Sequence, residues 1–150
     1  ALKMDAPDIK GIDGSVNSNL DIKADYAIEN IKKYDFVFIN VKGTDEAGHD
    51  GNPKDKVFAI EKIDEMIGKI YDNVEESIIV VTADHSTPVS VKDHTADPVP
   101  IVIWGEPIRT DDVTRFDERS ATKGGLLRIK GVKLMNILLD LIGKSEKFGA

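Results

Sequence analysis

The three histidines of the sequence lie close to acidic residues, at spacings that suit metal binding. Asp45 and His49 stand four residues apart, Asp84 and His85 are adjacent, and His94 follows nine residues later. Carboxylate oxygens and imidazole nitrogens are ligands for zinc, manganese and similar divalent ions. Taken singly, Asp45 could be an ordinary N-cap or loop residue, Asp84 could cap the end of a strand, and a lone loop histidine is seldom a ligand. Because several coincidences would be needed here, a metal site is the favoured interpretation.

Two such clusters suggest two ions. Paired ions about 3.5–4 Å apart stabilise the entering and leaving oxygens in phosphoryl and ester chemistry together. The residues alone therefore indicate metal-assisted chemistry of this class.

Alternating β-rich and amphipathic stretches are expected to position the clusters, as in α/β proteins. Strands are predicted at 35–41, 77–82 and 99–104, and helices at 21–34, 53–71 and 132–142. Two clusters follow the first and second predicted strands, and ligands of open α/β sheets bind at that edge. We therefore predict an α/β fold, a mostly parallel sheet flanked by helices, with the metal residues in loops at one edge.

Local signals refine the predicted helices. Asp21 is a candidate N-cap for the first, and Pro53 opens the second at a tolerated position. The apolar spacing predicts a buried stripe on the second helix and another on the last, with Gly143 at the C-cap. The stripes are Val57, Ile60, Ile63, Ile67 and Ile70, and Leu134, Ile137, Leu138, Leu141 and Ile142.

Composition excludes several classes of function. The 150 residues hold 27 Asp and Glu against 20 Lys and Arg, a net charge of −7 with neutral histidines, so there is no basic footprint for nucleic acid. Cysteine is absent, which excludes disulfides, thiolate zinc sites and thiol nucleophiles. No apolar run approaches the ~18 residues that a membrane span needs, and no leader-like segment opens the sequence. We expect one domain, no membrane partner and a cytoplasmic location.

One further motif has two interpretations. Gly124 and Gly125, beside Lys123 and Arg128, could cradle a phosphate, although the spacing of a nucleotide P-loop is absent. A turn leading into a strand at 126–130 is the favoured alternative.

The metal-type residues occur in segments that resemble a known family. The order Asp-x-x-x-His, Asp-His and a later His is similar to the ligand order of the alkaline phosphatase superfamily. The wider segments 41–51 and 82–90 closely resemble the archaeal-type, cofactor-independent (2,3-bisphosphoglycerate-independent) phosphoglycerate mutases. The closing segment 123–150 is also similar to theirs.

This resemblance implies roles for the five residues. Asp45, His49 and His94 would ligate one divalent ion, and Asp84 and His85 a second. Manganese is expected first, with zinc, cobalt or magnesium as alternatives. The whole enzyme would interconvert 3-phosphoglycerate and 2-phosphoglycerate through a phosphoserine, in glycolysis and gluconeogenesis.

The resemblance also implies missing parts. The family's nucleophilic serine has no counterpart here, so no catalytic residue is assigned; Ser86 and Ser90 are nearest, and loop capping is favoured for Ser86. The chain would be the incomplete, C-terminal part of a split, alkaline phosphatase-like catalytic domain. Residues 1–20 would be a connector returning from a missing inserted domain, and 21–150 the metal-binding part. We expect the chain alone to be inactive. We also expect it to self-associate or to be poorly soluble, because an incomplete sheet exposes an edge and an apolar face.

Two other functions stay open. One is a different phosphohydrolase or phosphomutase of the same superfamily, since such metal residues serve many reactions. The other is a noncatalytic metal-binding or interaction module.

Overall fold

The computed structural model describes residues 4–106 and 108–146. The ends of the predicted connector and of the metal-binding part, residues 1–3 and 147–150, lie outside the described residues, as does the end of the closing segment. The described residues divide into two compact units, the first comprising 4–74 with 87–95 and the second 75–86 with 96–146. The elements are α1 (Leu20–Asn30), α2 (Gly43–Asp50), α3 (Pro53–Asn73), β1 (Ile79–Thr82), β2 (Ile101–Trp104), α4 (Glu118–Ala121), the 3₁₀ turn η1 (Gly131–Lys133) and α5 (Leu134–Leu141).

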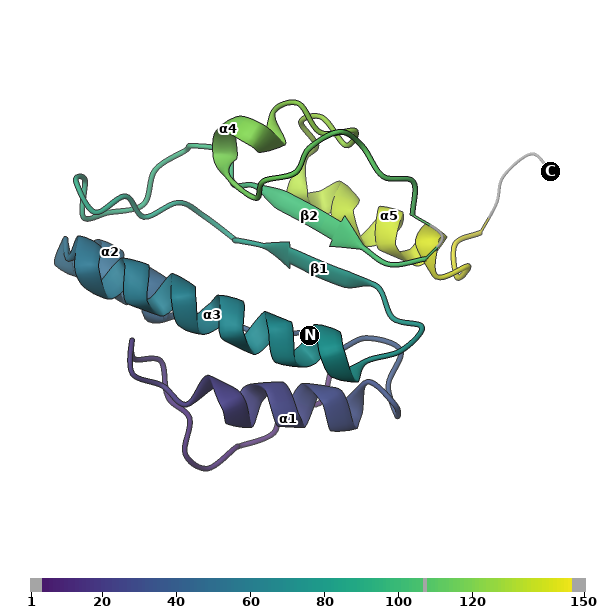
Figure 1. Cartoon of the computed structure of the whole chain (residues 1–150), viewed down its shortest axis with the longest axis horizontal. Helices are drawn as coiled ribbons and strands as arrows, with labels where there is room; N and C mark the ends of the chain where they lie inside the picture. The colour runs from purple at the N-terminus through teal and green to yellow at the C-terminus, as the bar shows by residue number, and fades with distance from the viewer. Residues whose placement is uncertain (1–3, 107, 147–150) are drawn as a thin grey trace. The chain divides into compact units, whose positions relative to one another are not determined.

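The first unit is built on helix α3, which packs against both α1 and α2 (Figure 1). Its core centres on Leu20 and Ala24 of α1 and Met66 of α3. Partly buried residues complete it: Ile39, Val41, Ile63, Ile67 and Ile70. The predicted stripe on α3 is therefore right in its second half, whereas Val57 and Ile60 are exposed. The buried face of the first half runs instead through Ala59.

Side-chain caps fix where α1 and α3 begin. Asn19 rather than the predicted Asp21 caps α1, because its side chain accepts a hydrogen bond from the Asp21 amide. Asn52 caps α3 by accepting from the amides of Lys54 and Asp55, with Pro53 in the first turn as expected. The two predicted helices are confirmed, although α1 ends at Asn30 instead of residue 34.

The predicted first strand, 35–41, is wrong as a strand, because within the described residues these positions belong to no sheet. The burial nevertheless alternates as in a strand. Ile39 and Val41 pack against the helical core, whereas Phe36 and Phe38 are exposed. The continuous apolar run reflects one covered face and one exposed apolar face, not burial on both faces.

In the second unit, β1 and β2 form the only sheet found among the described residues. They pair antiparallel, with Ile79 opposite Trp104 and Thr82 opposite Ile101. Both strands coincide with predicted ones. The expected mostly parallel sheet is not confirmed, since the direction of pairing depends on how the chain returns and not on the strand sequences themselves.

The glycine pair of the second unit lies in a turn. The Gly125 amide donates to Oδ2 of Asp111 at 2.6 Å, and the Val113 amide donates to Oδ1 at 2.9 Å. These two hydrogen bonds hold the pKa of Asp111 below its ordinary value. A carboxylate on the Gly125 amide opposes phosphate binding there, so the turn interpretation is favoured, although no strand forms at 126–130.

The last predicted helix begins with η1 and continues as α5. Its apolar stripe is half-buried at Leu134, Ile137, Leu138 and Leu141, while Ile142 is exposed. Gly143 has a φ of 69°, the left-handed conformation that stops a helix, as its predicted role requires.

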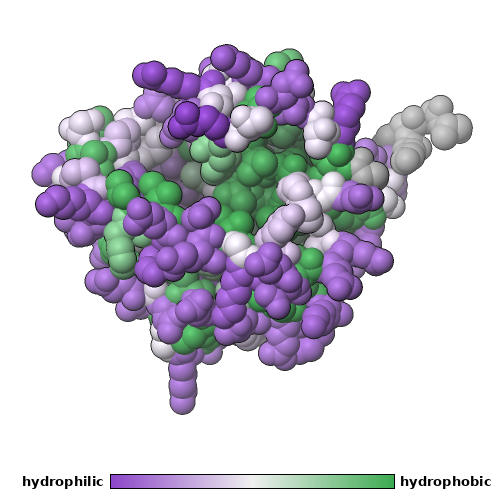
Figure 2. Space-filling model, in the orientation of Figure 1, coloured by the Kyte–Doolittle hydropathy of each residue, from purple (hydrophilic) through white to green (hydrophobic). Residues whose placement is uncertain are grey.

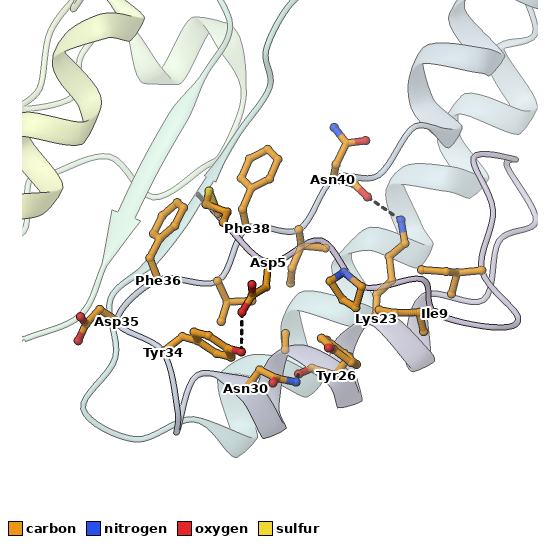
Figure 3. Close-up of a pocket in the computed structure, with 16 residues that line it drawn as sticks. Asp5, Ile9, Lys23, Tyr26, Asn30, Tyr34, Asp35, Phe36, Phe38 and Asn40 are labelled. Atoms are coloured by element: carbon orange, nitrogen blue, oxygen red, sulfur yellow. Dashed lines mark hydrogen bonds between the residues drawn. The ribbon is translucent and has the colours of Figure 1, made fainter. Parts of the chain in front are cut away.

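Apolar side chains reach the surface in several places (Figure 2). The most exposed large ones are Phe38, Leu127 and Val132. A cavity of about 430 Å³ in the first unit is lined by α1 and by residues between 4 and 40, with Phe36, Tyr34 and Lys23 at its wall (Figure 3). No helix in the described part of the chain is long and apolar enough to cross a membrane.

Candidate metal centre

Asp45 and His49 lie on helix α2, not in the predicted loop. The i,i+4 spacing places both side chains on one helical face. Acidic residues in the first turn and a histidine in the last complement the helix dipole, and Gly51, with a φ of 68°, ends the helix in the left-handed conformation. The helix therefore positions two of the predicted ligands without help from a strand end.

The structure brings Asp45, His49 and His94 together in the first unit. Oδ1 of Asp45 lies 3.5 Å from Nε2 of His49 and 3.5 Å from Nε2 of His94, and the two nitrogens are 3.2 Å apart. Ligand atoms about 2.1 Å from an ion stand about 3.4 Å apart at a tetrahedral angle and about 3.0 Å apart at an octahedral one. The triangle therefore has the dimensions of three ligands around one cation.

Segment 87–95 carries His94 to α2. The amides of Val91 and Lys92 both donate to the Pro88 carbonyl, which closes a tight turn, and Lys92 takes a φ of 61°. Its carbonyl oxygen then lies 3.1 Å from Nδ1 of His49. A carbonyl only accepts, so Nδ1 of His49 carries the hydrogen.

That tautomer bears directly on metal binding. In a neutral His49 ring, Nε2 then bears a lone pair, which faces Nε2 of His94 at 3.2 Å. That lone pair can bind a cation, or it can accept a hydrogen bond from a protonated Nε2 of His94. One oxygen and two imidazole donors, without sulfur, suit zinc, manganese or a similar ion.

The cluster is open to solvent on one side. The side chains of Asp45, His49 and His94 are 24%, 41% and 50% exposed. Three protein ligands with positions left for water or substrate are typical of catalytic rather than structural metal sites. The residues present therefore fit a divalent cation.

A shell of residues missed by the sequence analysis surrounds the cluster. The Thr87 hydroxyl donates to Oδ1 of Asp45 at 2.6 Å, and Thr87 is only 5% exposed. Helix α2 can lie against Thr87 because Gly48 has no side chain; a Cβ at Gly48 would be 2.9 Å from Cγ2 of Thr87. The available signal was the position of Thr87 inside the segment 82–90 that carries the family resemblance.

Asp84 and His85 follow β1, as predicted, in the second unit. The His85 amide donates to Oδ1 of Asp84 at 3.2 Å, and Nε2 of His85 lies 3.7 Å from Oδ2. Asp84 is exposed and His85 half-buried. Their assignment to a second ion stays a prediction.

Comparisons with known proteins agree with a metal-dependent function. The model of the metalloenzyme superfamily matches residues 3–141. A Methanococcus vannielii protein named 2,3-bisphosphoglycerate-independent phosphoglycerate mutase is 52% identical over 99% of this chain and 37% of its own length. A Methanocaldococcus jannaschii protein with that name, numbered 1, is 50% identical over 98% of this chain and 36% of its own.

A solved structure of a Pyrococcus horikoshii protein superposes with a TM-score of 0.91 and 51% identity, covering 94% of this chain and 43% of that one. The chain thus spans little more than a third of the length of the curated relatives it matches. Because the family model covers nearly all its residues, the chain belongs to the metalloenzyme superfamily.

Proposed function

We propose that this chain forms a metal-binding part of the catalytic domain of a 2,3-bisphosphoglycerate-independent phosphoglycerate mutase. The observation that carries the proposal is the Asp45–His49–His94 triangle, with sides of 3.2 to 3.5 Å. It occurs in a chain that is about half identical, over nearly its whole length, to relatives bearing that name. Membership of the superfamily alone is compatible with many metal-dependent reactions. The names of the relatives are what favour the phosphoglycerate mutase reaction among them.

In this proposal the chain supplies ligands for two divalent ions. Asp45, His49 and His94 hold one ion, and Asp84 and His85 contribute to the other. Manganese is the first candidate, with zinc, cobalt or magnesium as alternatives. When bound, such ions neutralise charge on a transferring phosphoryl group and make an attacking hydroxyl more acidic.

The nucleophilic serine is assigned to the portion of the longer protein outside the matched region. Ser86 and Ser90 are the nearest serines to the proposed ligands in sequence, and neither is proposed as a nucleophile. The proposal includes the interconversion of 3-phosphoglycerate and 2-phosphoglycerate in glycolysis and gluconeogenesis, a cytoplasmic location, and a larger sheet in the complete catalytic domain. Residues 1–20 are proposed to be the connector into this part.

A chimera tests the proposal. The matched region of the Methanococcus vannielii relative is replaced by this chain, and conversion of 3-phosphoglycerate to 2-phosphoglycerate is measured with added Mn²⁺. We expect the chimera to be active and Asp45→Ala to abolish its activity. Asp50→Ala, the same change on an exposed residue of α2, is the matched control and should leave activity intact.

Three outcomes would contradict the proposal. They are an inactive but folded chimera, release of inorganic phosphate in place of isomerisation, and an Asp45→Ala chimera as active as its parent. Phosphate release would instead favour a phosphohydrolase of the same superfamily. The 150-residue chain alone should show no turnover, and robust turnover would mean that a nucleophile had been overlooked in it.

A further inference from the structure

Thr87 is a buried residue whose hydroxyl contacts the Asp45–His49–His94 cluster and which is not part of the hydrophobic core. It is one of two polar residues buried among those the structure describes. Its hydroxyl donates to Oδ1 of Asp45, a residue 42 positions earlier, at 2.6 Å. This is the same oxygen that lies 3.5 Å from both imidazole nitrogens.

The backbone of Thr87 is held from the other side. Its carbonyl oxygen accepts a hydrogen bond from Nζ of Lys56 on α3. The absence of a side chain at Gly48 on α2 lets the segment lie directly against that helix. Thr87 is therefore fixed by two helices while its hydroxyl is turned towards the carboxylate.

We propose that Thr87 is a positioning residue for the metal centre, one that holds the Asp45 carboxylate in its ligating orientation before the ion binds. This inference rests on the proposed metal site but not on the identity of the reaction. A carboxylate oxygen has two lone pairs, so Oδ1 can accept from Thr87 and bind a cation at the same time. Hydrogen bonds from a hydroxyl to an ionised carboxylate are short, about 2.5–2.7 Å, and the Thr87–Asp45 distance of 2.6 Å lies in this range.

The proposal predicts how affinity depends on the hydroxyl. Groups that orient metal ligands typically account for about 10–100-fold in metal affinity. Thr87→Val, which keeps the shape of the side chain but removes the donor, should raise the Mn²⁺ dissociation constant of the chain by about that factor. Thr87→Ser restores the donor and should bind Mn²⁺ as the unmodified chain does.

The measurement is a Mn²⁺ titration followed by the electron paramagnetic resonance signal of free Mn²⁺, with the fold of each variant checked by circular dichroism. Thr44→Val is the matched control: it makes the same change on α2, one residue before Asp45, and should leave the affinity unchanged. If Thr87→Val does not fold, Thr87→Ala is the second variant, because it removes the donor without placing a methyl group at its position.

Combining Thr87→Val with Asp45→Ala separates positioning from a general structural role. Without a carboxylate to hold, Thr87→Val should cost little further affinity. The proposal is wrong if folded Thr87→Val binds Mn²⁺ as well as the unmodified chain, or if Thr87→Ser binds it as poorly as Thr87→Val. It is also wrong if the double variant loses as much affinity as the separate losses of Thr87→Val and Asp45→Ala combined. If the unmodified chain binds no Mn²⁺, the titration is repeated by calorimetry with Zn²⁺, Co²⁺ and Mg²⁺, and if it binds none of them both the metal site and this inference fail. If Thr87 controls the affinity but the chimera is inactive, only the assigned reaction fails.

Discussion

Replacing Gly48 by alanine should lower the free energy of unfolding of this protein, although a glycine-to-alanine change at an open position of a helix should raise it. A new Cβ at Gly48 would lie 2.9 Å from Cγ2 and 3.0 Å from Cβ of Thr87, and closer still to its carbonyl oxygen. Carbon atoms pack best at about 3.5–4.0 Å, so segment 87–95 must move away from α2. The hydrogen bond from Thr87 to Asp45, at 2.6 Å, then stretches or breaks.

The magnitude follows from three contributions to the free energy of unfolding. Gly→Ala in a helix interior stabilises by about 1 kcal/mol, whereas overpacking costs about 1–3 kcal/mol. Losing a hydrogen bond to a charged group costs a further 1.5–3 kcal/mol or so. We therefore expect Gly48→Ala to destabilise the chain by about 1.5–5 kcal/mol and also to weaken Mn²⁺ binding.

Gly68→Ala is the matched control. Gly68 lies on α3, and a Cβ there would have nothing within 4 Å, so this variant should be stabilised by about 1 kcal/mol. Urea unfolding followed by circular dichroism measures both changes. A Gly48→Ala protein as stable as Gly68→Ala, with unchanged Mn²⁺ affinity, would refute the close contact between α2 and Thr87.

Four other predictions follow from the structure. Nitrogen-15 spectra of the histidine rings should show His49 with its hydrogen on Nδ1, and the opposite tautomer would exclude the bond to the Lys92 carbonyl. Asn52→Ala should cost about 1 kcal/mol in urea unfolding, since it removes the cap of α3, and no loss would contradict that role. Hydrogen bonds from the amide of Ser120, and next from its hydroxyl, hold the pKa of Asp117 below its ordinary 3.8. The stabilisation that this carboxylate gives is fully present above its unfolded-state pKa and is lost as the pH falls through its folded-state pKa. Asp117→Asn should therefore make the free energy of unfolding depend less steeply on pH across that range. An equally steep dependence would count against the prediction. Sedimentation of the chain should reveal self-association through exposed apolar surface such as Phe38, and a clean monomer at high concentration would argue against it.

The ligands of the first cluster could be proposed from sequence because their chemistry is carried by residue type and spacing. Asp45 and His49 are four residues apart whether the segment is a loop or a helix. The helix itself was missed because Gly43 and Gly48 have low intrinsic helix propensity, and contacts to other segments outweigh it. The acidic first turn and Gly51 were the local signals that could have indicated α2.

For the strands, the sequence indicated which residues form them but not how they pair. The residues of β1 and β2 could be identified from their apolar, β-branched runs, but their antiparallel pairing could not, because it depends on how distant segments meet. The equally apolar segment 35–41 packs its alternate residues Ile39 and Val41 on the helical core without joining a sheet among the described residues. Sheet formation depends on partners as well as propensity.

The contacts around Asp45 and His49 were the least accessible to sequence reasoning. Thr87 looks like an ordinary loop threonine until the fold places it against Gly48 and Asp45. Lys92 likewise contacts His49 through its backbone carbonyl, whose direction depends on an unusual φ and not on the lysine side chain. Contacts of this kind depend on tertiary structure and are not encoded in a local pattern.

Anomalous diffraction from a crystal of the chain grown with Mn²⁺ tests the central claim most directly. We predict an anomalous peak bonded to Oδ1 of Asp45 and to Nε2 of both His49 and His94, the three atoms that form the 3.2 to 3.5 Å triangle. A map with no peak among these atoms, at Mn²⁺ concentrations that saturate the chain in solution, would contradict the metal centre.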